Sequence, residues 1–561
     1  MTRHDSFRVL IIGGYGTFGG RLVELLADQS RLKLIVAGRS LAKAQSLCSR
    51  LPAAAVLEPR ALDRDGDIDR ALTEIAPDIL VDATGPFQIY GDDPYRLVKA
   101  CLKHAIHYLD FADGSAFARD ISQFDAEAKA RGLFVLSAVS SCPALSGAAI
   151  RELARDMAYV EDIEGGIAPS PFAGVGVNVI RAIASYAGQP ITLMRDGRKA
   201  LAYGLTESRR VTVCPPGHLP LKSRRFSLVD VPDLQLVPET RPGLKSIWFG
   251  AAPVPVLYLR MLNAMAWLVR LRLLPGLKGL AGLCHFAINR FAWGEHRGGM
   301  FVRVTGRGAS GERIARSWHL LAEGDAGPYV PSMAIDAVVR NVLAGEAPAP
   351  GARAATQELS LDDFARGFMV KSIMTGIRDE PAANQPLYQR ILGAAWERLP
   401  APIRSLHMVE STRRFSGRAK VERGYRLFAQ LIGMLHRFPK AGAEIPVDVM
   451  LERRGTGELW QRTFAGRVFR SWQDQGQGRS DHLIVERFGP VSVGLALVEG
   501  EGRLEYVVCR WKFLGIPMPA FMAPGGRTYE FVKDGRFHFH VEIAHPWFGL
   551  IVCYQGWLEE S

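Results

Sequence analysis

The sequence has few cysteines, and their spacing suggests neither disulfides nor metal ligation. Its seven cysteines are scattered and odd in number, and they form neither a CxxC motif nor a Cys/His ligand spacing. We therefore expect reduced thiols and no structural metal. The N-terminus also lacks a charged leader followed by an apolar core and a cleavage site, so we expect a cytoplasmic protein rather than a secreted one.

Long apolar runs and dense basic runs are also missing. No uninterrupted segment approaches the roughly twenty apolar residues of a membrane-spanning helix. The formal charge is +12, yet no Lys/Arg run carries interleaved stacking aromatics, so we expect no nucleic-acid partner. An anionic cofactor or an anionic membrane surface then remains to explain the basic excess. With 561 residues the chain is long enough for about two to four packed units.

A glycine cluster lies near the N-terminus, between an apolar run and an amphipathic run. Val9 to Ile12 have the pattern of a strand buried on both faces, and leucines at helical spacing follow the cluster. Between them stands G-x-G-x-x-G, residues Gly14, Tyr15, Gly16, Thr17, Phe18 and Gly19. This strand, turn and helix order is typical of a dinucleotide site, where Gly16 lets the backbone touch a pyrophosphate at the helix N-terminus.

The end of the second predicted strand indicates which dinucleotide binds. An acidic residue there holds the ribose hydroxyls of NAD. This sequence instead places Arg39 and Ser40 after the strand, and these residues suit a 2′-phosphate through charge-assisted hydrogen bonds. The cofactor we predict is therefore NADP. A solvated loop arginine is the alternative interpretation of Arg39.

Strand-like and helix-like segments alternate up to about residue 145. Six strand-like segments, the last at residues 133–139, predict an α/β fold with a Rossmann doubly wound parallel sheet over residues 1–145. Ligands of such sheets gather at the carboxyl ends of the strands. Three segments stand out at those ends, namely 84–88, 112–115 and 140–143.

Several of these motifs resemble the saccharopine dehydrogenase-like oxidoreductases, a group that includes saccharopine reductases and carboxynorspermidine synthases. The resemblance covers residues 7–375. It is carried by GGYGTFGG (13–20), AGR (37–39), ATGPFQIYG (83–91), AIHYLDFADG (105–114) and SSCPALSG (140–147). It implies NADP binding, with the loop formed by Thr84, Gly85, Pro86 and Phe87 and the Asp113-Gly114 loop near the nicotinamide.

Three residues of the family-like run HYLDFADG are candidate catalytic groups. Tyr108, Asp110 and Asp113 have side chains able to organise the cofactor or conduct a proton. The alternative is that the two aspartates only cap the loop that follows. The sequence by itself identifies no proton donor.

The regular alternation stops after the sixth strand. Alternating segments such as 300–304 and 317–321 predict an inserted, antiparallel α+β substrate domain at residues 146–330. A helix at 331–344 then begins a return segment, 331–377, that completes the Rossmann domain. Two segments rich in proline and small residues, 344–351 and 379–386, are typical of linkers.

The inserted domain contains a basic apolar stretch at residues 247–294. No acidic residue occurs between Glu239 and Glu295, and Arg260, Arg270 and Arg272 interrupt its apolar runs. Such a pattern favours a surface helix in a lipid headgroup layer, hence peripheral contact with the inner face of a membrane and a lipid-like substrate. A buried helix pair or a homodimer interface are the alternatives.

A C-terminal α+β domain rich in antiparallel sheet is predicted at residues 387–561, with a helix at 421–437 before most of its strands. It resembles an uncharacterised domain fused behind bacterial reductases of this group, which implies no activity. Alternation places His538, His540 and Glu542 on one strand face. We interpret them as a solvated face rather than a metal site.

Together these features predict an NADP-dependent oxidoreductase that reduces a carbonyl, imine or activated double bond of a lipophilic small molecule. Two alternatives stay open. One is a reductase of amino-acid or polyamine substrates. The other is a non-catalytic protein that senses NADP(H) and binds a lipid or a partner.

Overall fold

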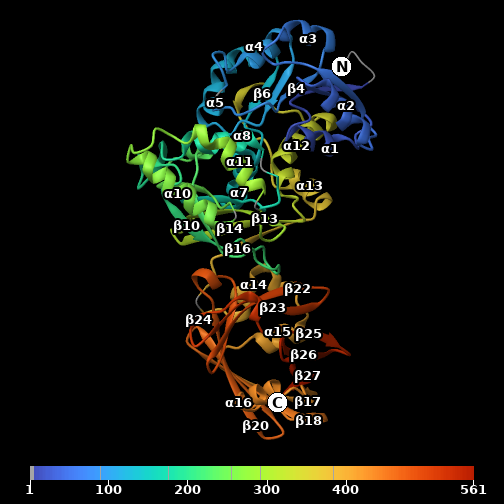
Figure 1. Cartoon of the computed structure of the whole chain (residues 1–561), viewed down its shortest axis with the longest axis vertical. Coiled ribbons are helices and arrows are strands. Elements are labelled where there is room, and N and C mark those ends of the chain that lie inside the picture. The colour runs from blue at the N-terminus through green and yellow to red at the C-terminus, as the bar shows by residue number, and fades with distance from the viewer. Residues whose placement is uncertain (1–5, 89, 175, 254, 291, 383) are drawn as a thin grey trace. The chain divides into compact units, whose positions relative to one another are not determined.

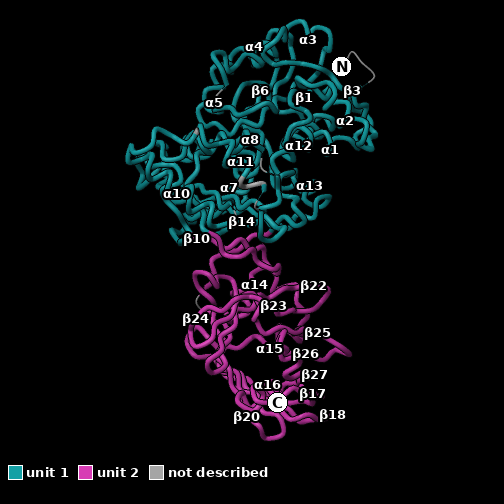
Figure 2. Tube along the Cα trace, in the orientation of Figure 1, with its two compact units in different colours: residues 1–209, 225–375 teal, residues 210–224, 376–561 magenta. Residues whose placement is uncertain are grey.

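The computed structural model describes residues 6–88, 90–174, 176–253, 255–290, 292–382 and 384–561. They form two compact units, which Figure 2 distinguishes by colour. The first unit holds residues up to 209 and residues 225–375, and the second holds residues 210–224 and 376–561. The segment 210–224 thus lies within the predicted inserted domain but packs in the second unit.

The first unit contains the predicted parallel Rossmann sheet, which confirms the α/β fold class. Its strand order is β15-β6-β5-β4-β1-β2-β3, and its neighbouring strands pair in parallel. The strands are β1 (Phe7–Ile12), β2 (Leu32–Gly38), β3 (Val56–Ala61), β4 (Ile79–Asp82), β5 (His107–Asp110), β6 (Phe134–Ser137) and β15 (Gly351–Ala354). The sequence analysis did not anticipate β15, which follows directly from a segment with linker composition.

Helices connect these strands and cover the sheet (Figure 1). They are α1 (Gly19–Leu26), α2 (Leu41–Arg50), α3 (Ile68–Ile75), α4 (Arg96–Lys103), α5 (Ser115–Asp120) and α6 (Asp125–Ala130). The expected return helix forms as α12 (Val330–Ala344) and packs on α1. There the Ser332 hydroxyl donates to the Phe18 carbonyl oxygen at 2.9 Å. The return segment therefore supports the helix that follows the glycine loop.

A second sheet of the first unit has the order β10-β11-β12-β7-β13-β14-β16. Its strands are β7 (Tyr159–Ala168), β10 (Ser208–Val211), β11 (Arg224–Leu228), β12 (Ser246–Ala251), β13 (Arg297–Arg307), β14 (Arg313–Glu323) and β16 (Ile373–Asp379). β7 pairs antiparallel with β13 but parallel with β12, so this sheet is mixed where we expected an antiparallel one. The parallel pair requires a crossover, and the chain between β7 and β12 is long enough to supply it.

The crossover and the connections near it supply the remaining helices of the first unit. They are α7 (Ser146–Leu153), α8 (Val177–Tyr186), α9 (Asp233–Thr240), α10 (Val256–Arg270), α11 (Ala281–Arg290) and α13 (Ala365–Val370), beside a hairpin of β8 (Pro190–Arg195) and β9 (Arg198–Tyr203). The basic apolar stretch 247–294 thus forms α10 and α11, while its positions 254 and 291 lie outside the described residues. No helix in the described part of the chain is long and apolar enough to cross a membrane.

The second unit is built on an antiparallel sheet that closes into a barrel, which confirms its predicted class. The order β22-β21-β20-β19-β18-β17-β27-β26-β25-β23 is completed by pairing of β22 with β23. The strands are β17 (Thr412–Arg423), β18 (Gly442–Arg454), β19 (Gly457–Phe464), β20 (Arg467–Gln475), β21 (Ile484–Phe488), β22 (Val491–Gly500), β23 (Arg503–Phe513), β24 (Ile516–Pro517), β25 (Thr528–Lys533), β26 (Arg536–His545) and β27 (Gly549–Glu560).

Three helices accompany the barrel, namely α14 (Leu387–Leu392), α15 (Ala401–His407) and α16 (Leu427–Leu435). The helix predicted at 421–437 is shorter, because residues up to Arg423 continue β17. The segment 210–224 joins this unit through Arg378, whose Nε donates to the Cys214 carbonyl oxygen at 2.6 Å and whose Nη1 donates to that of Ile391 at 2.7 Å. This buried guanidinium ties the segment to the start of the C-terminal chain.

Candidate functional site

The glycine loop lies between the end of β1 and the start of α1, as the sequence predicts. A Cβ atom on Gly19 would lie 2.3 Å from the Gly13 carbonyl oxygen, and one on Gly14 would lie 2.9 Å from that of Ile11. The loop's own backbone therefore requires these two glycines. In the described part of the chain the N–H groups of Thr17 and Phe18 have no acceptor. They point to an anion such as a pyrophosphate at the start of α1.

The residues after β2 form a second half of the same site. The Tyr15 ring lies over Gly38, where a Cβ atom would be 2.5 Å from the ring, and the Tyr15 hydroxyl accepts from the Ser40 N–H at 2.9 Å. The Ser40 side chain caps α2 by accepting from the Lys43 N–H at 3.4 Å. Arg39 is exposed and has no hydrogen bond or ion pair with the described residues. Its guanidinium is thus available to a 2′-phosphate beside the start of α2.

The loop that follows β4 is held by Asp82, a residue that the sequence analysis missed. The fully buried Asp82 carboxylate accepts from the Thr84 N–H at 3.0 Å, from the Thr84 hydroxyl at 2.6 Å and from the Tyr90 hydroxyl. Burial raises the pKa of Asp82, and these donors partly offset that rise. The start of the predicted nicotinamide loop, Thr84 to Phe87, and Tyr90 beyond it are thereby fixed to one strand end. The signal for Asp82 was available in the sequence, as an acid at the end of an apolar strand.

Tyr108 and Asp110 lie within the parallel sheet and are buried. The Tyr108 hydroxyl donates to Asp82 Oδ2 at 3.5 Å. Asp110 Oδ1 accepts from the N–H groups of Ala112 and Ala138, at 2.8 and 2.7 Å, and from the Ser137 hydroxyl at 3.0 Å. Burial raises the pKa of Asp110 to about 7. These contacts favour the alternative in which Asp110 organises the loops around it.

Asp113 differs from these two residues because it faces a cavity. This cavity, of about 550 Å³, is lined by Gly16, Thr17 and Phe18, by Gly85 to Phe87, and by residues of the second sheet and of α8. Asn178, at the start of α8, donates from Nδ2 to the Gly85 carbonyl oxygen at 2.9 Å, which links that helix to the nicotinamide loop. The predicted cofactor loops and the inserted domain thus enclose one space.

The wall of this cavity is mostly apolar. Its polar side chains, in the described part of the chain, are Thr17, Asp113, Ser140, Ser141, Cys142, Ser170, Asn178, Tyr186, Asp230 and Cys284. No lysine, arginine, histidine or glutamate lines it among the described residues. A substrate with several charges would therefore leave water without matching counter-charges, which is costly. The described wall thus offers no arginine or lysine to an anionic group.

Three titratable groups of the wall lie close enough to influence one another. Asp113, Asp230 and Tyr186 all line the cavity, and the Ser115 hydroxyl donates to Asp230 Oδ1 at 2.7 Å. Although Asp113 is exposed to the cavity, the surrounding chain partly desolvates it and raises its pKa to about 6, and burial also raises the pKa of Asp230. Burial, helped by both carboxylates, raises the pKa of the Tyr186 hydroxyl well above its ordinary value. Tyr186 and Asp230 carry no local motif, so sequence reasoning missed them.

Helices α10 and α11, here called the helix pair, contribute both to the cavity wall and to the protein surface. Leu259 and Leu262 of α10 and Cys284 of α11 line the cavity. On the outer side Leu257, Met261, Trp267, Leu268, Leu283 and Phe286 are exposed, with Leu283 exposed by 67%. A single layer of helix therefore separates the apolar cavity from an apolar exterior.

His538 and His540 of β26 lie on the outer face of the barrel. Phe537 and Phe539 are buried, whereas His538 stacks on Phe531 and His540 on Tyr529. In the described ranges no group of three or more His, Cys, Asp or Glu side chains is arranged to hold a metal ion.

Models of known protein families match a segment near each end of the chain. Residues 9–136 match the saccharopine dehydrogenase NADP binding domain, and residues 399–558 match a domain of unknown function, DUF4166. The first match spans the glycine loop, Arg39, the nicotinamide loop and Asp113. It confirms the resemblance noted in the sequence, the NADP cofactor and an oxidoreductase class. No curated protein matches the chain.

The chain also matches parts or all of several solved structures at low identity. Apo saccharopine dehydrogenase (L-Glu forming) from Saccharomyces cerevisiae is 14% identical with a TM-score of 0.47, and the match covers 67% of this chain and 100% of that chain. A probable dehydrogenase from Thermotoga maritima is 11% identical with a TM-score of 0.31, covering 65% and 95%. A dehydrogenase from Thermus thermophilus in complex with NAD and UDP-GlcNAcA is 12% identical with a TM-score of 0.30, covering 65% and 94%.

Proposed function

We propose that the first unit reduces a lipophilic, uncharged substrate at a membrane surface. The premise is that residues 9–136 form a saccharopine dehydrogenase NADP binding domain. The reducible group is a carbonyl, an imine or an activated double bond. The observation that carries this proposal is the cavity of about 550 Å³ whose described lining contains no basic side chain. Its volume lies in the range of about 300–1,000 Å³ typical of small-molecule sites.

Residues of the glycine loop and of the end of β2 would hold the cofactor. The free N–H groups of Thr17 and Phe18 suit its pyrophosphate, and Arg39 with Ser40 suits its 2′-phosphate. NADPH, when bound, supplies the hydride. The loop from Thr84 to Phe87 fixes the nicotinamide end, because Asp82 and Asn178 hold that loop from two sides.

Charge decides between this substrate class and an amino-acid substrate. A saccharopine-like or carboxynorspermidine-like molecule carries carboxylates, which require fixed cationic partners. The described cavity wall offers carboxylates of its own, Asp113 and Asp230, which repel the carboxylates of such a substrate although they attract its ammonium groups. We therefore favour the lipophilic class over the amino-acid or polyamine class.

Reduction also requires a proton, and the cavity wall has groups able to supply it. With its pKa raised to about 6, Asp113 is partly protonated in a weakly acidic to neutral solution. Tyr186 keeps its proton at any physiological pH because its pKa is raised. We assign Asp113 as the proton source for the substrate and Tyr186, which keeps its proton, as a hydrogen-bond donor to the reacting group.

The helix pair gives a route for an apolar substrate. Its exposed leucines and aromatic residues suit the acyl boundary of a bilayer, while Arg260, Arg270 and Arg272 suit anionic headgroups. We propose that the cytoplasmic protein contacts the inner face of the membrane through these helices.

The reaction is tested by following NADPH oxidation with purified full-length protein. We expect turnover with long-chain ketones or imines, or with a lipid extract, and none with saccharopine or other dicarboxylic amino acids. NADPH binding without oxidation of any of these would favour the sensing alternative. Turnover of saccharopine would contradict the proposed substrate class.

Membrane contact is tested by co-sedimentation with phosphatidylglycerol/phosphatidylcholine vesicles. Leu257→Asp and Leu283→Asp should reduce the bound fraction, because each places a carboxylate on the apolar exterior. Leu201→Asp is the matched control, since Leu201 is also exposed but lies on β9, outside the helix pair. Equal sedimentation of the three variants and the unchanged protein would refute membrane contact through the helix pair.

A further inference from the structure

The barrel of the second unit contains a cavity that the reaction in the first unit does not use. Its volume is about 550 Å³, and strands from all around the barrel line it. A small closed barrel normally fills its interior with side chains. Space of this size left empty forfeits the dispersion contacts of every side chain around it. The barrel interior therefore has the form of a ligand-binding cavity rather than of a filled hydrophobic core.

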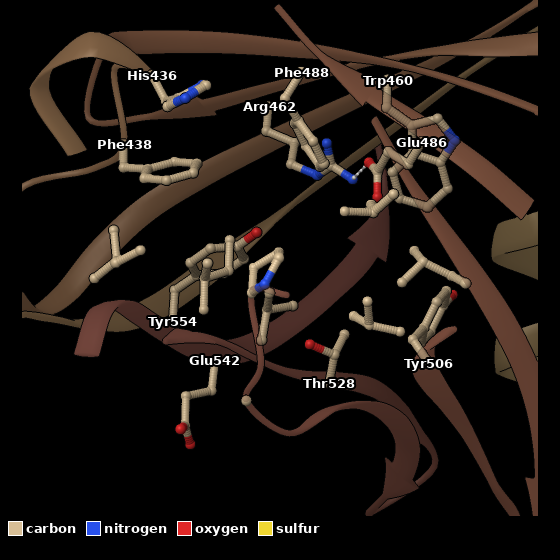
Figure 3. Close-up of a pocket in the computed structure, with 18 of the residues that line it drawn as sticks. His436, Phe438, Trp460, Arg462, Glu486, Phe488, Tyr506, Thr528, Glu542 and Tyr554 are labelled. Carbon is tan, nitrogen blue, oxygen red and sulfur yellow. Dashed lines mark hydrogen bonds and ion pairs between the residues drawn. The ribbon is translucent and has the colours of Figure 1, made fainter. Parts of the chain in front are cut away.

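The lining of this barrel cavity is predominantly apolar and aromatic. Phe438, Phe464, Phe537, Phe539 and Tyr554 surround its middle. Figure 3 shows Phe438 and Tyr554 on one side of the space and Phe488 and Trp460 on the other. An apolar molecule gains most from such surroundings, since it leaves water without losing hydrogen bonds.

Two of the carboxylates that reach the cavity have partners, whereas Glu542 has His540 at 4.0 Å, outside the lining. Arg462 Nη2 lies 3.3 Å from Glu486 Oε1 (Figure 3). The Ser471 hydroxyl donates to the same oxygen at 2.6 Å. Elsewhere on the wall Glu530 is paired with His407 at 2.7 Å and accepts from the Tyr506 hydroxyl at 2.8 Å. Arg462 is the one arginine or lysine in the described lining, and Glu486 already pairs with it, so neither residue type is left for a ligand carboxylate or phosphate. These groups suit a hydroxyl or carbonyl instead.

The cavity opens to the surface beside α16. Ile432 and Leu435 of this helix line the cavity, yet Leu435 is 72% exposed, so it lies where the cavity meets solvent. The outer side of α16 is apolar too, with Leu427, Phe428 and Leu431 exposed. A lipid-like molecule thus meets apolar side chains on its way in.

We propose that the barrel binds one uncharged lipid, an apolar molecule with a single hydroxyl or carbonyl group, with that group facing the Arg462–Glu486 pair and the apolar part among the aromatic side chains. The proposal assigns a ligand class to the domain at residues 399–558. It does not depend on the function proposed for the first unit.

The test uses the full-length protein and a long-chain alcohol that carries a photoreactive diazirine. After irradiation, peptide mapping should find crosslinks on β18, β19 and β26, competed by excess unlabelled alcohol. The corresponding fatty acid should compete less well, because Arg462, the one arginine or lysine of the described lining, is already paired with Glu486 and because Glu542 repels a carboxylate. Crosslinks confined to the first unit, or none that excess alcohol removes, would overturn the proposal.

Variants that fill each cavity identify the site. Val449→Trp fills the barrel and should remove barrel crosslinking while leaving NADPH binding and oxidation in the first unit unchanged. Ala184→Phe fills the first cavity and is the matched control, which should keep the barrel crosslinks. Unchanged barrel crosslinking in a folded Val449→Trp protein would also refute the proposal. The mapping on the unchanged protein decides the question if that variant fails to fold.

Discussion

Replacing Gly19 with alanine should separate the steric role of the glycine loop from its cofactor role. The added Cβ atom would lie 2.3 Å from the Gly13 carbonyl oxygen and 2.9 Å from Gly13 C and Gly14 Cα. All three are backbone atoms, so no side-chain rotation relieves the overlap. The loop and the start of α1 must move apart instead, and forced overpacking of this kind typically costs about 1–3 kcal/mol.

The neighbouring residue provides the matched control. A Cβ atom on Gly20 meets nothing closer than 3.8 Å, and Gly20 lies in α1. Because alanine favours a helix over glycine by at most about 1 kcal/mol, Gly20→Ala should be neutral or slightly stabilising. The two variants differ by one position and carry the same added atom.

The measurements are urea denaturation of the full-length proteins and titration with NADPH. We expect Gly19→Ala to unfold the first unit at lower urea concentration. We also expect it to bind NADPH at least about tenfold more weakly, since a loss of about 1.4 kcal/mol in binding corresponds to tenfold. Gly20→Ala should match the unchanged protein in both assays. Equal NADPH affinity for the two variants would refute the reasoning that the loop positions the pyrophosphate.

Three further outcomes follow from other side chains. Arg39→Ala should weaken NADPH binding by about 1.5–2 kcal/mol, roughly ten- to thirtyfold, and leave NADH binding unchanged, because only a charge-assisted contact to the 2′-phosphate is lost. Calorimetry tests this, with Arg50→Ala as the control. An unchanged ratio of NADPH affinity to NADH affinity would contradict it. Since partial desolvation raises the pKa of Asp113 to about 6, the folded protein binds this proton more tightly than the unfolded chain, so stability should fall as pH rises from about 4 to about 6. Asp113→Asn should flatten that fall in pH-dependent urea titrations and remove the corresponding step from the pH–rate profile. Arg462→Met should destabilise the second unit by about 3 kcal/mol because Glu486 loses its cation in a mostly buried site, and adding Glu486→Gln should restore most of the loss in a double-mutant cycle.

The parallel sheet was predictable because its signals are local. Each strand is a short apolar run, and the glycine loop joins strand to helix within a few residues. β15 was missed because Gly351–Ala354 follows a linker-like segment and has no apolar run of its own. Its place in the sheet comes from pairing with β6, more than two hundred residues earlier.

The candidate site was predictable only in part, for a related reason. The glycines, Arg39 and Asp113 lie within motifs, whereas Tyr186 and Asp230 reach the cavity from a helix and a loop of the inserted domain. Only the folded chain brings these side chains together, so their spacing in the sequence does not indicate that they share a cavity.

The barrel illustrates the same distinction. Alternation in β26 correctly separates Phe537 and Phe539 from the histidines between them. Closure depends on the pairing of β22 with β23, which no single strand reveals. The interior cavity depends in turn on that closure.

The path of the chain through its two units limits how this protein can be divided. The polypeptide passes between them after residues 209, 224 and 375. A stop codon after residue 375 would delete Arg378 and leave the segment 210–224 without the guanidinium that holds Cys214. A separately expressed C-terminal half would lack residues 210–224 of its own unit, and the N-terminal half would carry this segment without its partners. One protease cut between residues 376 and 386 should therefore not yield two independent folds. Recombination that exchanges only the C-terminal gene segment would likewise separate residues 210–224 from the chain that holds them. We therefore expect the two units to be inherited together and to diverge as a pair.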